Sequence, residues 1–204
     1  MTIIVRCMRL AAALAVAASL AACDRPGGTS VAAPFRGVDI TGAQYARNLA
    51  LPDAHGRPRT LADFKGKVTV VFFGYTQCPD VCPSTLAELA QFKKALGPRA
   101  DKFQGVFVTV DPERDTPEIL QSYMASFDPS FVALRGSVEQ TKAVAKEFKI
   151  FFAKVPGKTE GSYTMDHTAA AFVLDANGQP RLYERYGGGV EALTADVKAL
   201  IDAM

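Results

Sequence analysis

Two cysteines and one histidine are the residues of this chain whose types and spacing could do chemistry. Cys78 and Cys82 are four residues apart, between an apolar run and a segment with helical spacing. On a helical turn, side chains at this spacing point to one side, and their Cα atoms are about 6 Å apart. Two such thiols can form a disulfide, exchange with another disulfide or bind one metal ion. The spacing alone does not choose among these chemistries.

A structural disulfide is the simplest of these alternatives, but the surroundings of the cysteines favour a reactive or metal-binding pair. A bridge that closes so short a loop constrains the unfolded chain very little. Pro79 and Pro83 shape the loop that carries the thiols, and residues 74–76 present it at the end of an apolar strand. Open α/β sheets place their functional sites at that end of a strand.

His167 lies immediately before the apolar run 168–175. A lone histidine is more often a hydrogen-bonded structural residue than a ligand. In a thioredoxin-like order of elements, however, the loop that enters this run approaches the loop after residues 67–73, so that two thiolates and one imidazole would converge. This soft set suits copper(I) and can accommodate copper(II), whereas a structural zinc site would lack a fourth ligand. Three further residues are expected not to be ligands, one in a solvated loop and two in the core: His55, Met124 and Met165.

The elements that must position these residues follow from apolar periodicity and from capping residues. Continuous apolar runs predict strands buried on both faces, and helical spacing behind a capping residue predicts the helices. This alternation, which ends in an antiparallel pair and a helix, predicts an α/β protein of thioredoxin-like fold, with a mixed central sheet, helices on both faces and an N-terminal β-hairpin extension. The expected strands are 67–73, 105–110, 132–134, 168–175 and 180–186, the helices 84–96, 117–127, 138–148 and 190–203, and the hairpin lies around 49–61.

The N-terminus carries the pattern of a secretory signal. Arg6 and Arg9 precede an uncharged, alanine-rich run at residues 10–22, which is too short to span a bilayer comfortably. The small residues before Cys23 look like a bacterial lipobox; the alternative is a plain signal peptide with an incidental cysteine. We therefore predict a lipoprotein signal peptide at 1–22, a lipid-anchored flexible tether at 23–38 that begins with lipidated Cys23, and one domain at 39–204. This places the domain on the periplasmic, extracytoplasmic side of a bacterial cell envelope, anchored to a membrane by lipid.

Composition and charge exclude two classes of protein. The chain has 204 residues, of which 49% are hydrophobic and 22% charged, so a largely disordered chain is excluded. The formal net charge of +2 disappears when Arg6 and Arg9 leave with the signal peptide. With neither a basic patch nor a nucleic-acid motif, no nucleic-acid partner is expected.

Three motifs in order identify a family resemblance. Residues 74–83 (GYTQCPDVCP), residues 108–117 (VTVDPERDTP) and the Asp166-His167 pair before a strand resemble the SCO/SenC family. Proteins of this family are copper-binding, have a thioredoxin fold and help to assemble the copper site of cytochrome c oxidase. The similarity extends from about Asp39 to the C-terminus.

The resemblance implies a ligand set and a partner. It implies that Cys78, Cys82 and His167 bind copper, as Cu(I), Cu(II) or both, and that the protein delivers this copper to the binuclear centre of cytochrome c oxidase subunit II. Such a metallochaperone binds and transfers its metal without turnover in the ordinary sense, and a second copper chaperone is a candidate source of the metal. Three acidic residues near the implied site are hypothesised to tune the ligands or to contact a partner: Asp80, Asp111 and Asp166. For Asp80, ordinary solvation of a loop residue is the favoured alternative.

Two other functions use the same thiols. In a thiol-disulfide oxidoreductase, Cys78 and Cys82 would be the redox-active pair that reduces the copper-site cysteines of the oxidase, and His167 would be dispensable. A redox or copper sensor is the other alternative. A peroxidase of the related thioredoxin-like group is a weaker one, because it explains neither the thiol spacing nor His167.

Overall fold

The computed structural model describes residues 35–185 and 190–204. The predicted signal peptide, the lipidation site Cys23 and most of the predicted tether lie outside the described residues. The described residues belong to one compact unit that begins at Phe35.

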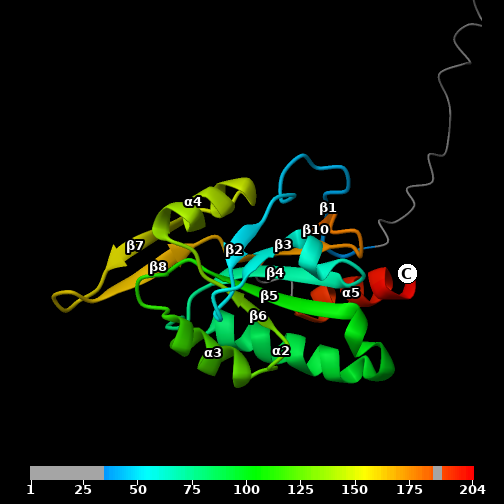
Figure 1. Ribbon diagram of the computed structural model, residues 1–204, viewed down its shortest axis with the longest axis horizontal. Helices are drawn as coiled ribbons and strands as arrows, with labels where there is room; N and C mark the ends of the chain where they lie inside the picture. The colour runs from blue at the N-terminus through cyan, green and yellow to red at the C-terminus, as the bar shows by residue number, and fades with distance from the viewer. Residues whose placement is uncertain (1–34, 186–189) are drawn as a thin grey trace, which may run out of the picture. The chain divides into compact units, whose positions relative to one another are not determined.

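A six-stranded mixed sheet forms the centre of the domain (Figure 1). The three strands β4, β5 and β6 pair in parallel, whereas β9, β10 and β1 continue the sheet on the other side of β4 in antiparallel pairs. Every residue of β4 and β5 is buried, which agrees with the strands predicted from their continuous apolar runs. In sheet order the strands are β1 (Val38–Asp39), β10 (Pro180–Arg185), β9 (Ala170–Leu174), β4 (Val68–Gly74), β5 (Phe103–Thr109) and β6 (Val132–Leu134).

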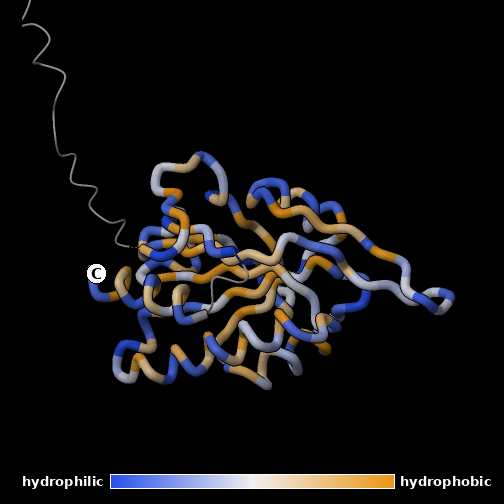
Figure 2. Tube along the Cα trace, turned by 180° about the vertical axis from the view of Figure 1, so that it is seen from behind, coloured by the Kyte–Doolittle hydropathy of each residue, from blue (hydrophilic) through white to orange (hydrophobic). Residues whose placement is uncertain are grey.

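Helices cover both faces of this sheet (Figure 1). Successive residues of β4 point to opposite faces, so Phe72 belongs to the cluster under α2, α3 and α5, and Phe73 to the cluster under α4. Figure 2 shows the apolar residues concentrated along the strands between these layers. The architecture is thioredoxin-like, as predicted. The helices are α2 (Val81–Ala95), α3 (Pro117–Ala125), α4 (Val138–Glu147) and α5 (Val190–Asp202), with 3₁₀ turns η2 (Leu61–Phe64) and η3 (Gly97–Lys102).

Two hairpins lie outside the central sheet. One, β2 (Ala50–Pro52) with β3 (Pro58–Thr60), is the predicted N-terminal hairpin. The other, β7 (Phe152–Pro156) with β8 (Tyr163–His167), was not expected, and it extends beyond the end of the central sheet in Figure 1. His167 is therefore the last residue of a strand, whereas the prediction placed it in a loop.

A pair of buried carboxyl groups holds the first residues of the domain. The Asp196 carboxylate in α5 accepts the backbone N–H groups of Arg36, at 3.0 and 2.8 Å, and of Gly37, at 2.8 Å. Glu184 of β10 lies so close that a Cβ atom at Gly37 would be 2.1 Å from its Oε1. Residues 35–38, which were predicted to belong to the tether, thus contact the domain, and Val38 pairs with β10.

Glu184 gives the domain a predicted pH dependence. Its burial, together with the neighbouring Asp196, raises the pKa of Glu184 to about 7. The unfolded chain ionises this group at a lower pH than the folded chain, so the stabilisation is fully present at acidic pH and is lost as the pH rises towards neutrality. Discounted for partial solvent access, we expect the loss to be about 1–2 kcal/mol.

Denaturant unfolding measured between about pH 5 and about pH 8 checks this prediction. Glu184→Gln is expected to lose that part of the pH dependence, because a neutral amide neither titrates nor repels Asp196. Glu191→Gln, at an exposed position of α5, is the matched control and should follow the wild type. Equal pH dependence in the wild type and in Glu184→Gln would contradict the prediction.

Candidate metal centre

The two cysteines meet where β4 leads into α2. Cys78 lies in the connecting loop and is partly exposed, while Cys82, in the first turn of α2, is wholly buried. Both are free thiols, and Cys78 packs against the core cluster to which Cys82 belongs. Burial raises the pKa of the Cys82 thiol far above its ordinary value. The two thiols thus lie around the start of α2, with Cys82 inside the protein and Cys78 near the surface.

Gly74 makes room for the buried thiol. It is the last residue of β4, and a Cβ atom at this position would lie 2.6 Å from the Cys82 sulfur and 2.8 Å from Phe107 Cε2. Real Cβ atoms do not approach other atoms so closely, so only glycine lets the sulfur pack directly against the strand. The Gly74 carbonyl also accepts the N–H of Val110 at 2.8 Å, which joins this strand end to the loop after β5.

A buried carboxylate links the cysteine loop, which is residues 75–80 between β4 and α2, to the end of β5. Asp115 is wholly buried, and it accepts hydrogen bonds from the Thr76 hydroxyl at 2.6 Å, the Thr76 N–H at 3.1 Å and the Thr109 hydroxyl at 2.5 Å. Burial raises the pKa of Asp115, although these hydrogen bonds oppose the shift. Because Thr76 lies two residues before Cys78, Asp115 fixes the path by which the chain reaches the thiols.

His167 contacts the cysteine loop through the ring of Tyr75. Its imidazole packs edge-on against Tyr75, with ring centroids 5.9 Å apart, and its Nδ1 is 3.2 Å from the Thr168 carbonyl oxygen. The Tyr75 carbonyl in turn accepts the N–H of Cys78 at 3.2 Å. Within residues 35–185 and 190–204, no three His, Cys, Asp or Glu side chains are close enough together to hold a metal ion. The structure thus places both thiols around the start of α2 and the imidazole next to the loop that carries Cys78.

The three acidic residues occupy different environments. Asp111 is 1% exposed, and its carboxylate accepts a hydrogen bond from the Tyr163 hydroxyl. Asp80 precedes α2 as its N-cap residue without a capping hydrogen bond from its side chain, and Asp166 lies in β8; both are exposed. In the described part of the chain, neither of these exposed carboxylates has a hydrogen bond to the thiols or to His167. This exposure agrees with ordinary loop solvation of Asp80, and contact of either residue with a partner stays a prediction.

Arg114 was not among the predicted site residues. Its guanidinium lies between the cysteine loop, the loop after β5 and the β7–β8 hairpin, and it forms an ion pair with Asp111. The motif 108–117 contains this arginine. The Asp, Pro and Thr residues of the motif are those expected of a turn followed by a helix N-cap, so the motif gave no separate reason to assign a role to Arg114. The hairpin itself had a weak signal, since only Met165 of β8 is buried.

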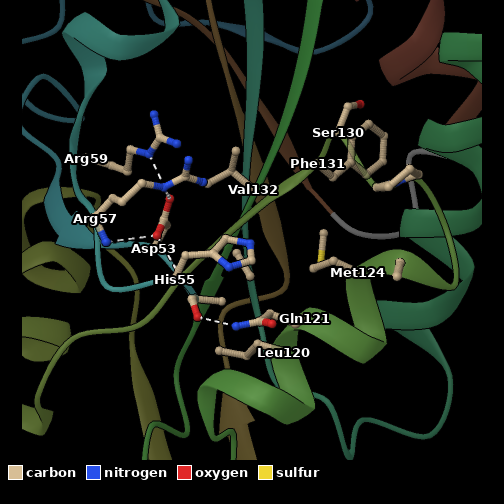
Figure 3. A pocket seen from close by; sticks show the side chains of 14 residues that line it. Asp53, His55, Arg57, Arg59, Leu120, Gln121, Met124, Ser130, Phe131 and Val132 are labelled. Atoms are coloured by element: carbon tan, nitrogen blue, oxygen red, sulfur yellow. Dashed lines mark hydrogen bonds and ion pairs between the residues drawn. The ribbon is translucent and has the colours of Figure 1, made fainter.

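A cavity elsewhere contains none of the predicted ligands. It has a volume of about 400 Å³ and lies between the β2–β3 turn, α3 and the segment 129–133 (Figure 3). His55, which is exposed, lies in it, as the prediction of a solvated loop residue requires. The Asp53 carboxylate binds the Nε atoms of Arg57 and Arg59, at 3.0 and 2.9 Å, and so offsets their charge within the cluster. Met124 and Met165 are core residues, in agreement with the prediction.

None of the described helices is both long and apolar enough to cross a membrane.

Comparison with known proteins places the chain in a family. The model of the family described as SCO1/SenC matches residues 38–202. A SCO2-like protein of Rickettsia felis is 36% identical over 130 residues, which are 63% of this chain and 63% of the relative's length.

Solved structures agree with the family match. ScoI of Bradyrhizobium japonicum, whose structure has copper bound, is 40% identical with a TM-score of 0.67, over 75% of this chain and 97% of that one. Apo Sco1 of Thermus thermophilus is 37% identical with a TM-score of 0.72, over 81% and 96% of the two chains. Since the family model matches most of the chain, the protein belongs to the SCO1/SenC family.

Proposed function

We propose that this protein is a copper metallochaperone that binds copper through Cys78, Cys82 and His167 and assists assembly of the binuclear copper centre of cytochrome c oxidase subunit II. The observation that carries the proposal is the packing of His167 against Tyr75, which begins the loop that carries Cys78 and leads to Cys82. Membership of a family of cytochrome c oxidase assembly proteins, together with the copper in the related ScoI structure, supports the choice of metal and of partner.

The chemistry of the donors fits copper as a cargo. Two thiolates are soft ligands that select copper(I), and an added imidazole suits copper(II) as well. Both thiols must lose their protons when the metal binds. Because His167 is not within a metal-binding group among the described residues, the imidazole must come closer to the thiols for all three ligands to engage one ion.

Metal binding by the purified, reduced protein tests the proposal. We expect one copper ion per chain, both as copper(I) and as copper(II). Because the imidazole is the donor that suits copper(II), His167→Ala should lose the copper(II) spectrum while the thiols still bind copper(I). His55→Ala, which changes the exposed histidine of the β2–β3 turn, is the control and should match the wild type. A protein that binds no copper would overturn the proposal, and a wild-type copper(II) spectrum in His167→Ala would remove that residue from the site.

A thiol-disulfide oxidoreductase is the second candidate, and the two free thiols around the start of α2 favour it. Reduction of an oxidised fragment of oxidase subunit II, measured with and without copper, separates the two functions. A reductase should act without copper, and His167→Ala should act at the wild-type rate. A metallochaperone should instead transfer copper to the reduced fragment, and this transfer should depend on His167.

The location is part of the same proposal. A lipid on Cys23 would hold the domain at the periplasmic face of a membrane, close to an oxidase. If this is correct, Cys23→Ala should move the protein from the membrane fraction to the soluble fraction of the cell envelope, and an unchanged membrane fraction would contradict it.

A further inference from the structure

We propose that Arg114 is a positioning residue, which fixes the β7–β8 hairpin, and with it His167, over the cysteine loop. This inference rests on the proposed function, because positioning matters only if His167 serves the thiol site. In this role Arg114 holds the imidazole near the thiols without binding the metal itself.

Hydrogen bonds from Arg114 reach three separate segments of the chain. Its Nη1 donates to Gln77 Oε1 at 3.1 Å, directly before Cys78, and to the Tyr163 carbonyl oxygen at 2.8 Å. Its Nε donates to the Asp111 carboxylate in the loop after β5. One guanidinium therefore joins the cysteine loop, the loop after β5 and the first residue of β8.

Ring contacts strengthen the same connection. The guanidinium lies 3.6 Å from the centroid of the Tyr163 ring and 5.9 Å from that of Tyr75. The Tyr163 hydroxyl donates to the other oxygen of the Asp111 carboxylate at 2.9 Å, so that Asp111, Arg114 and Tyr163 form a closed cluster. Tyr75 is the ring against which His167 packs. Arg114 thus contacts the start of β8 directly and the ring that supports its end.

These contacts require an arginine in particular. A planar guanidinium can stack on a ring while its edge donates several hydrogen bonds, whereas a lysine ammonium is a point charge without that geometry. Two aromatic rings flank the group, and three oxygen acceptors on different segments receive its bonds. An exposed ion pair would contribute little to stability, but this arginine side chain is only 21% exposed and its Asp111 partner 1%.

The alternative is a purely structural role, in which Arg114 stabilises the fold and has no particular effect on the imidazole. The protein offers a matched control for that alternative. Arg135 binds the Pro112 carbonyl oxygen, at 3.1 and 2.8 Å, and so supports the same loop from the other side. Within the described residues, Arg135 makes no hydrogen bond or cation–π contact with the hairpin. Loss of Arg135 should therefore affect stability alone.

The experiment compares copper(II) and copper(I) binding in the full-length protein. Arg114→Ala should weaken copper(II) binding by about tenfold or more and shift its electron paramagnetic resonance spectrum towards that of His167→Ala. Copper(I) binding, which the two thiols dominate, should change much less. Arg114→Lys should recover stability through its charge but not the copper(II) spectrum. The double variant Arg114→Ala/His167→Ala should be no worse than His167→Ala, because both changes remove the same contribution.

Arg135→Ala should keep the wild-type copper(II) spectrum, even if its free energy of unfolding falls. A wild-type copper(II) spectrum and affinity in Arg114→Ala would overturn the positioning role, as would an equal change in Arg135→Ala. If Arg114→Ala does not fold, Tyr163→Leu removes the ring and hydroxyl from the hairpin side of the cluster and should give the same spectral shift; its absence would likewise overturn the role. Failure of the wild type to bind copper would instead overturn the proposed function.

Discussion

Cys78→Ser and Cys82→Ser are each expected to abolish tight copper(I) binding. A serine hydroxyl is a hard, protonated group at neutral pH, whereas copper(I) selects soft thiolates. A single remaining thiol with one imidazole leaves the ion without its second sulfur. Competition with a copper(I) chelator measures the loss, which we expect to exceed about a hundredfold in affinity, or about 2.7 kcal/mol.

The two variants differ in what they do to the fold. Cys78 is partly exposed, so its replacement should leave the free energy of unfolding nearly unchanged. Cys82 is buried, and a serine there places a hydroxyl inside the protein, so its stability must be measured beside its affinity. Ser84→Ala, in the first turns of α2, is the control with full binding. Tight copper(I) binding in a folded Cys78→Ser protein would refute the role of the thiol pair.

Gly74→Ala is expected to cost about 1–3 kcal/mol of stability and also to disturb the thiol pair. The added methyl group would meet the Cys82 sulfur at 2.6 Å and the Phe107 ring at 2.8 Å, so the strand, the ring or the first turn of α2 must shift. A shift of that turn changes the separation of the two sulfurs. Denaturant unfolding and copper(I) affinity measurements should therefore both show a loss.

Gly105→Ala is the matched control for this effect. Gly105 lies in β5, and its added Cβ would meet the Phe131 ring at 2.9 Å rather than a thiol. It should reduce stability without changing copper(I) affinity. Combining Gly74→Ala with Cys82→Ser should relieve part of the stability loss, because the smaller oxygen replaces the sulfur. Strictly additive stability losses in this double variant would show that the sulfur contact is unimportant.

Local sequence signals predicted the elements that bury continuous apolar runs or carry their own caps. The strands β4 and β5 were predicted from such runs, and all of their residues are buried. Thr116 caps α3 by accepting the N–H of Ile119, and Ser137 with Gln140 forms a capping box at the start of α4. In each case the residues that determine the element are within a few positions of one another, so one sequence is enough to identify it.

The β7–β8 hairpin was missed because its position depends on residues far away in the chain. Its strands are largely exposed, so they lack an apolar period. Met165 is buried in the core, and hydrogen bonds to the Asp111–Arg114 segment hold the start of β8. The turn residues between the two strands, Gly157 and Gly161, were the available signal.

The candidate site was predictable to different extents for its two donor types. The spacing of Cys78 and Cys82 predicts that the two thiols lie near each other, and Cys78 packs against the cluster that contains Cys82. Helix geometry alone does not bring this about, because α2 begins at Val81 and Cys78 lies in the loop before it; the two residues are near because they are only four apart along the chain. His167 comes from a different segment, and its separation from the thiols depends on Tyr75 and on the hairpin. No spacing in the sequence contains that information.

The pairing of β4 with β9 has a consequence for how the protein matures. β4 precedes the cysteine loop, while its antiparallel neighbour β9 follows His167 after most of the chain has been made. Contacts between segments so distant in sequence form late and slow down folding. During synthesis, both thiols therefore exist before the histidine strand has been translated. If the domain folds after export, its thiols are open to oxidation until β9 has joined the sheet, so a reducing partner would be useful before any metal arrives.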